Sequence, residues 1–114
     1  MVTVYHHSRC KKSRACIAYL KEKNIEFQIV EYLKTPFNTE SLEIILKKLN
    51  LQPHDLIRTQ EPIFKKSFRN KVFSEHEWLQ IMIENPTLIK RPIIEAKYKA
   101  IIGETEENIN EIIF

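Results

Sequence analysis

The first third of the chain consists of two short β-type runs with one amphipathic helix between them. Residues 2–6 and 27–32 alternate apolar and polar side chains and are rich in residues that favour strands. Residues 13–23 between them place three side chains on one helical face: Cys16, Tyr19 and Leu20. A strand–helix–strand unit joins parallel strands through a right-handed crossover, so we predict an α/β protein.

In the second strand, alternation predicts Phe27 and Ile29 on the same side, with Glu31 as a possible third member. After the break at 35–36, Asn38 or Thr39 is expected to cap a helix. The predicted buried stripe of that helix is Leu42, Ile45, Leu46 and Leu49.

A short helical turn is predicted from Pro53 to about Ile57, followed by a basic, irregular stretch over 58–71. Residues 74–77 (SEHE) match a capping box, which begins a helix that Asn85-Pro86 ends. The expected apolar face of this helix is Trp78, Leu79, Met82 and Ile83.

The last quarter of the chain predicts a β-hairpin and a helix. Residues 93–94 and 100–102 are the two arms, with a turn around 97–99, and Thr105 caps a helix with Ile109, Ile112 and Ile113 inward. The expected fold is a thioredoxin-like mixed sheet flanked by helices, with a helical insertion between the βαβ and ββα halves. We expect residues 1–114 to form a single domain and the protein to be a monomer.

Composition excludes several classes of function. The net charge of +3 is too small for a nucleic-acid footprint, and a single glycine excludes a Gly-rich phosphate loop. No apolar run is long enough to span a bilayer, and the first residues do not resemble a signal peptide. We therefore expect a cytoplasmic protein that binds neither membranes nor nucleic acid directly, with its two cysteines as reduced thiols.

Cys10 is the strongest candidate for chemistry. It lies between the first strand and the first helix, with Arg9 before it and two lysines after it. The free N–H groups of a helix start and nearby cations lower the pKa of a thiol, and the thiolate is the nucleophile. The alternative is that Cys10 is a small loop residue whose basic neighbours are merely solvated.

The other cysteine and the serine after Cys10 have different expected roles. Ser13 stands where a second cysteine would complete a Cys-x-x-Cys pair, so this motif has one thiol. Its hydroxyl either donates a hydrogen bond to the thiolate or serves only the helix N-terminus. Cys16 lies on the apolar face of the helix, and we expect it to fill the core.

The four histidines show no metal-ligand spacing, and we predict no metal site. His6 and His7 are adjacent and point apart, while His54 and His76 fall on separate surface segments. His6, at the end of the first strand, either shares a proton with Cys10 or is structural.

Five segments together resemble the glutaredoxin-linked arsenate reductases, the ArsC family, to which Spx-type and YffB-type proteins are related. In chain order they read YHHSRCKKSR, YLKTP, LIRTQEPIFKK, NPTLIKRPII and IIGETEENINEII, and the resemblance covers nearly the whole chain.

The resemblance implies that Cys10 attacks arsenate, that glutathione resolves the adduct as co-substrate, and that glutaredoxin reduces the mixed disulfide. No bound cofactor is implied. It also implies that Pro92 is a cis-proline facing the cysteine, and that His6 and Ser13 favour the thiolate. The small oxyanion would be held by Arg58 and Arg91, because arginine offers forked, permanently charged donors. Taken without the resemblance, both arginines are ordinary surface cations.

The chain departs from the family pattern at two places. A third family arginine falls at Gly103-Glu104, where an acidic side chain would repel an oxyanion, and Ser8 replaces a proline two residues before the cysteine. Arg9 is a weak candidate to replace the missing charge.

Two other functions remain open. One is an Spx-like redox-sensing regulator that binds the C-terminal domain of the RNA polymerase α-subunit, although Ser13 removes the usual Cys-x-x-Cys switch. The other is a divergent member of the family without catalytic turnover.

Overall fold

The computed structural model describes all residues of the chain, 1–114, and its contacts divide them into two compact units. One unit contains both ends of the chain, Met1–Thr35 and Arg91–Phe114. The other is the intervening segment Pro36–Lys90. None of the helices combines the length and the apolar character that a membrane crossing requires.

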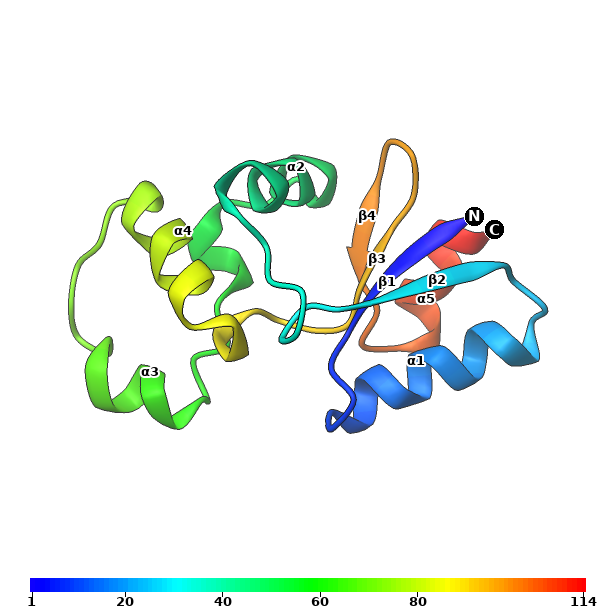
Figure 1. Cartoon of the computed structure of the whole chain (residues 1–114), viewed down its shortest axis with the longest axis horizontal. Coiled ribbons are helices and arrows are strands. Elements are labelled where there is room, and N and C mark those ends of the chain that lie inside the picture. The colour runs from blue at the N-terminus through cyan, green and yellow to red at the C-terminus, as the bar shows by residue number, and fades with distance from the viewer. The chain divides into compact units, whose positions relative to one another are not determined.

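The unit that contains the termini is built on a four-stranded sheet with the order β2-β1-β3-β4 (Figure 1). Strand β1 pairs in parallel with β2 and antiparallel with β3, and β3 and β4 form a hairpin. The strands are β1 (Val2–His6), β2 (Phe27–Glu31), β3 (Ile93–Glu95) and β4 (Ala100–Ile102). The predicted parallel pair, hairpin and mixed sheet are confirmed, and the fold is the thioredoxin-like α/β fold.

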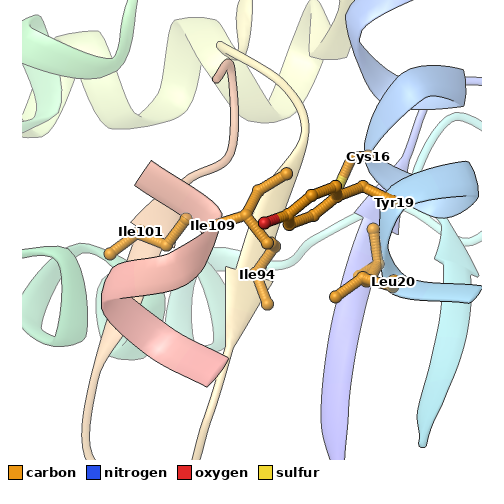
Figure 2. Packing of buried hydrophobic residues seen from close by; sticks show 7 residues of the cluster. Cys16, Tyr19, Leu20, Ile94, Ile101 and Ile109 are labelled. Carbon is orange, nitrogen blue, oxygen red and sulfur yellow. The ribbon is translucent and has the colours of Figure 1, made fainter. Parts of the chain in front are cut away.

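Helices α1 (Lys11–Glu22) and α5 (Glu106–Ile113) pack on one face of this sheet. Figure 2 shows apolar side chains of both helices next to apolar side chains of the sheet. The buried cluster consists of Val4, Cys16, Tyr19, Leu20, Ile94, Ile101 and Ile109. The Tyr19 hydroxyl also donates to Asn110 Oδ1 at 2.7 Å, which ties α1 to α5 without leaving a buried donor unpaired.

One expectation for this unit is wrong in detail, and one exposure could not be predicted. Helix α1 begins at Lys11 rather than Ser13, because the extended backbone of Cys10 makes that residue the N-cap. Ile29 is 45% exposed although its partner Val4 is fully buried. Strand β2 is an edge strand, with a neighbour on one side only, and strand alternation cannot report that position.

The regular elements of the unit over Pro36–Lys90 are all helices, joined by loops. Its elements are α2 (Thr39–Leu49), η1 (Pro53–Leu56), α3 (Pro62–Ser67), α4 (Glu75–Glu84) and η2 (Pro86–Leu88), where η marks a 3-10 helix. Asn38 caps α2 and Ser74 caps α4, each through a reciprocal capping box, as predicted for Ser74. The stretch 58–71 is not wholly irregular, because α3 forms within it after Pro62.

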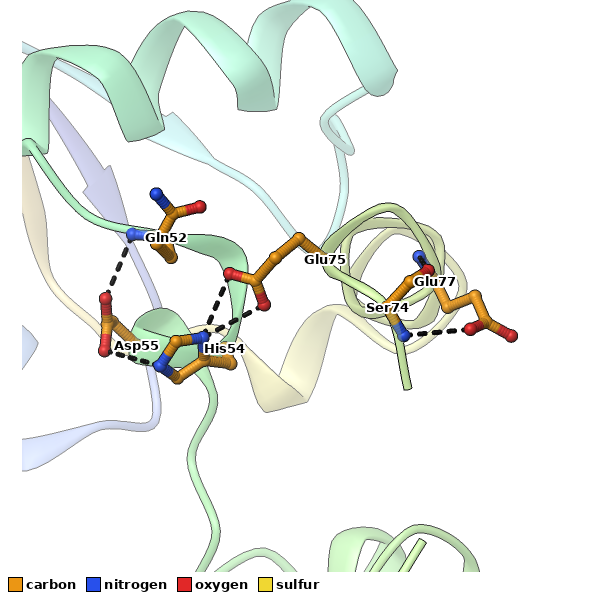
Figure 3. A network of polar contacts seen from close by, with 6 residues as sticks. All are labelled: Gln52, His54, Asp55, Ser74, Glu75 and Glu77. Carbon is orange, nitrogen blue, oxygen red and sulfur yellow. Dashed lines mark hydrogen bonds and ion pairs between the residues drawn. The ribbon is translucent and has the colours of Figure 1, made fainter. Parts of the chain in front are cut away.

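A polar network joins η1 to the start of α4 (Figure 3). His54 Nδ1 lies 3.0 Å from both carboxylate oxygens of Glu75, and its Nε2 lies 3.1 Å from Asp55 Oδ1. Asp55 also accepts a hydrogen bond from the backbone N–H of Gln52 at 3.0 Å. The hydrogen bond to Glu75, helped by the negative charges of Asp55 and Glu75, raises the pKa of His54.

Candidate active site

Cys10 occupies the N-cap position of α1, at the end of a tight turn after β1. The turn is closed by a hydrogen bond from the Cys10 N–H to the His7 carbonyl oxygen at 3.0 Å. At this position the backbone N–H groups of Ser13 and Lys12, which the first turn of a helix leaves without internal partners, lower the pKa of the Cys10 thiol without forming a capping hydrogen bond to its side chain. The predicted placement of the cysteine at a helix start therefore brings the thiol under the influence of two backbone N–H groups.

Arg91 adds a charged donor from a segment far away in the sequence. It immediately precedes β3, its side chain is only 8% exposed, and its guanidinium donates a hydrogen bond to the Cys10 sulfur. The peptide bond that joins Arg91 to Pro92 is cis. A guanidinium is always charged, so it favours the thiolate over the thiol.

The pKa of Cys10 reflects two opposing influences. Partial burial raises it, while the Ser13 N–H, the hydrogen bond and charge of Arg91, and the Lys12 N–H lower it. The lowering influences win, and the pKa lies below that of an ordinary cysteine. A partly buried thiol with a lowered pKa is the kind of sulfur that reacts as a nucleophile.

Ser13 supports the site through its backbone, and its hydroxyl has other partners. The fully buried side-chain oxygen accepts the backbone N–H of His7 at 3.0 Å and lies 2.6 Å from His6 Nδ1. Because a buried hydroxyl proton needs an acceptor, this arrangement favours donation from Ser13 Oγ to His6 Nδ1. Of the two roles predicted for the hydroxyl, the contacts favour shaping the helix start.

His6 is held next to this turn as a neutral ring. Burial lowers its pKa, the charge of Glu31 opposes that shift, and the charge of Arg14 adds to it. Glu31 is its register partner on the parallel strand β2. A neutral His6 with Nδ1 accepting from Ser13 carries its proton on Nε2.

Cys16 lies in the core on the buried face of α1, as expected. It is 1% exposed, and burial alone raises its pKa to about 12. Such a thiol stays protonated and unreactive at neutral pH.

The remaining arginines have local partners. Arg58 Nε lies 3.6 Å from Glu61 Oε1, and both side chains are about one-fifth exposed. Its backbone N–H donates to the Leu88 carbonyl oxygen at 2.7 Å, beside the short bridge between Ile57 and Ile89. Arg9 is exposed, and its backbone N–H donates to His7 Nδ1 at 3.2 Å.

One feature of the site escaped the sequence reasoning. Lys12 Nζ lies 3.2 Å from Glu104 Oε2, so the acidic residue noted near the last helix is paired with a lysine that follows Cys10. No local pattern links two residues 92 positions apart, although their opposite charges were visible. The structure contains no group of three or more His, Cys, Asp or Glu side chains able to hold a metal ion.

Residues 5–112, nearly the whole chain, match the sequence model of the ArsC family. The chain belongs to the ArsC family. The "Uncharacterized protein YfgD" of Escherichia coli K12 is 38% identical over 98% of this chain and 96% of its own length. A protein named "Arsenate reductase" from Neisseria meningitidis is 32% identical, over 98% of this chain and 97% of its own length.

Solved structures place the fold in the same group. The "Putative arsenate reductase from Yersinia pestis" superposes with a TM-score of 0.90 at 37% identity, covering 98% of this chain and all of that one. The ArsC-family resemblance read from the five sequence segments is thereby confirmed. Membership of the ArsC family makes thiol chemistry the class of reaction in which to interpret Cys10 and Arg91.

Proposed function

We propose that this ArsC-family protein is a thiol-dependent oxidoreductase that reduces arsenate or a related oxyanion, with Cys10 as its nucleophile. The observation that carries the proposal is the setting of the Cys10 sulfur. The Ser13 and Lys12 N–H groups and the Arg91 guanidinium lower its pKa despite partial burial. The arsenate reductases among its relatives support the choice of substrate.

In the first step the Cys10 thiolate attacks the arsenic of arsenate, an S–As bond forms, and one oxygen leaves as hydroxide. Arg91 is placed to bind the oxyanion beside the sulfur, because its forked donors match an oxyanion in geometry and charge. The helix N–H groups that hold the thiolate also stabilise negative charge close to it.

In the second step the thiol of glutathione attacks the Cys10 sulfur. The S–As electron pair passes to arsenic, which leaves as arsenite, while the glutathione thiol gives up its proton. The product is a Cys10–glutathione disulfide. Glutaredoxin then removes the glutathione by thiol–disulfide exchange and restores the Cys10 thiol. This cycle needs one protein thiol, which agrees with Ser13 at the position of a second cysteine, and it needs the reducing conditions of a cytoplasm.

The deciding experiment is arsenate-dependent oxidation of NADPH in the presence of glutathione, glutaredoxin and glutathione reductase. We expect turnover with the wild-type protein and none with Cys10→Ser, while Cys16→Ala keeps most of the activity. Cys16→Ala is the matched control, because it removes the other thiol of the same helix. Absence of turnover with a Cys10 that still alkylates rapidly would contradict arsenate as substrate.

A further inference from the structure

The ion pair between Lys12 and Glu104 lies at the edge of the thiol site. Lys12 is the second residue of α1, and its backbone N–H helps to lower the pKa of the Cys10 thiol. Glu104 directly precedes Thr105, the N-cap of α5. The two side chains meet at 3.2 Å, with 60% of Lys12 and 37% of Glu104 exposed.

Glu104 is fixed in this position through its neighbour Gly103. The Gly103 N–H donates to the Pro92 carbonyl oxygen at 2.8 Å, and Pro92 follows Arg91, the residue whose guanidinium reaches Cys10. Gly103 is also packed so closely that a Cβ atom would lie 3.0 Å from Ile94 Cδ1. Glu104 is therefore linked through Gly103 and Pro92 to Arg91, and Lys12 belongs to the helical turn that follows Cys10. Both partners of the ion pair lie close in the structure to groups that lower the pKa of the thiol.

This arrangement gives Lys12 two competing partners. An oxyanion bound at Cys10 and Arg91 would attract the Lys12 ammonium, while Glu104 holds that ammonium and itself repels the oxyanion. Exposed ion pairs contribute little net stability, so the pair opens readily when a stronger anion arrives. Opening leaves Glu104 at the rim, where its repulsion grows with the charge of the anion.

We propose that Lys12 is a further anion-binding residue of the Cys10 site, and that Glu104 restrains it and so selects against highly charged anions. The inference rests on the proposed oxyanion chemistry of Cys10 and goes beyond it by naming what tunes the affinity of the site. The Lys12 ammonium alternates between Glu104 and the bound anion. The carboxylate of Glu104 weakens the binding of dianions more than the binding of monoanions.

The test measures how well arsenate, phosphate and sulfate protect Cys10 from alkylation by iodoacetamide, a neutral reagent. The products are assigned by mass spectrometry, and the concentration of anion that halves the rate is determined at low ionic strength. No turnover is needed, so the result is separate from the arsenate reductase assay. The variants are Glu104→Gln, Lys12→Gln and the double variant.

Glu104→Gln is expected to lower the half-protecting concentration of dianions about two- to fivefold, the size of one exposed charge interaction. Lys12→Gln is expected to raise it by a similar factor. In the double variant the gain from Glu104→Gln shrinks, because the carboxylate acts partly through Lys12. Salt near 1 M should remove these differences, since exposed charges are then screened.

Two substitutions control for overall charge. Lys11→Gln removes an exposed cation from the same helical turn, and Glu106→Gln removes an exposed anion from the start of α5. Equal effects of Lys11→Gln and Lys12→Gln, or of Glu106→Gln and Glu104→Gln, would overturn the inference. So would a full Glu104→Gln gain in the Lys12→Gln background, or failure of every anion to protect Cys10.

If the predicted shifts appear while arsenate gives no turnover, the Lys12–Glu104 assignment holds and arsenate is the wrong substrate. If turnover appears but the shifts do not, the proposed function holds and the assignment fails.

Discussion

Cys10 shows how a few donors outweigh burial. Removing a thiolate from water raises its pKa, and only hydrogen bonds or opposite charge can reverse that effect. Two of the groups that lower this pKa are the backbone N–H groups of Ser13 and Lys12, which no side-chain substitution removes, and the third is the Arg91 guanidinium. The contribution of Arg91 is therefore the one that mutation can isolate.

Arg91→Gln should raise the pKa of Cys10 and slow its alkylation near neutral pH, while Arg91→Lys should have a smaller effect. For Arg91→Gln the alkylation rate near neutral pH is expected to fall roughly threefold or more. Charge-assisted hydrogen bonds are the strong ones, and a rise of one pKa unit is a tenfold decrease in the thiolate fraction. The measurement is the iodoacetamide rate as a function of pH. Arg9→Gln is the matched control, and an equal effect there would mean that overall charge, not the Arg91 contact, sets the pKa.

Ser13→Ala separates the two roles of that residue. The variant loses the hydroxyl that bonds His6 and the His7 N–H, so we expect a loss of about 1–3 kcal/mol in the free energy of unfolding. The Ser13 N–H, which lowers the pKa of Cys10, is retained in this variant, so that pKa should change little. Urea unfolding and the pH profile of alkylation measure the two effects. A large rise in the Cys10 pKa with unchanged stability would instead favour a direct hydroxyl–thiolate bond.

At the scale of elements, polar contacts hold together segments that are close in the fold and separate in sequence. The His54–Glu75 contact between η1 and α4 is the clearest example, because it joins a 3-10 turn to a helix start that already has its own capping box. Such a contact is sensitive to pH, since the charge on His54 decides its strength.

The pKa of His54 is raised in the folded protein, so this network stabilises the fold fully below the unfolded pKa and loses its effect as pH rises through the folded pKa. We expect a small decrease in stability between about pH 6 and pH 8 that is absent in His54→Gln. Urea midpoints across this range provide the measurement. His76→Gln, on the neighbouring helix, is the control and should keep the wild-type dependence.

Gly103 fixes the approach to α5 by close packing. In Gly103→Ala the new methyl group would lie 3.0 Å from Ile94 Cδ1 and 3.3 Å from Ile109 Cγ1, so the core must shift. The expected cost is about 1–3 kcal/mol of unfolding free energy, typical of overpacking. Thermal or urea unfolding tests this, and a neutral or stabilising effect would show that the two isoleucines yield freely.

At the scale of the whole molecule, the two cysteines differ in exposure and in the direction of their pKa shifts. Cys10 is partly exposed, with a lowered pKa, while Cys16 is 1% exposed, with its pKa raised to about 12. Under the proposed function Cys10 is the reactive thiol, whereas Cys16 packs in the core between α1, α5 and the sheet.

We therefore expect one thiol to react rapidly in the native protein and the second to react only when the core opens. The rate of Cys16 labelling should follow the stability of the core and rise with added urea. Quantitative alkylation followed by mass spectrometry tests this. Rapid labelling of Cys16 in native buffer would mean that the core cluster opens locally at little cost.

The sequence by itself determined the order of the four strands and of helices α1, α2, α4 and α5, and the place of Cys10 at a helix start. Those features depend on side-chain period and on capping residues within a few positions, as at Ser74 and Thr105, so they are readable locally. The limits of local patterns appear at Ile29, which alternates correctly and is still exposed because β2 is an edge strand.

Only the tertiary structure decided which distant groups meet at the sulfur. The contact of Arg91 with Cys10, the choice of His6 and His7 as partners of the Ser13 hydroxyl, and the pairing of Lys12 with Glu104 all depend on how strands and helices pack. A family resemblance could suggest Arg91, but charge and spacing along the chain could not identify Glu104 as the partner of Lys12. The physical reason is that hydrogen bonds and charges act through space over a few ångströms, whichever residues folding brings there.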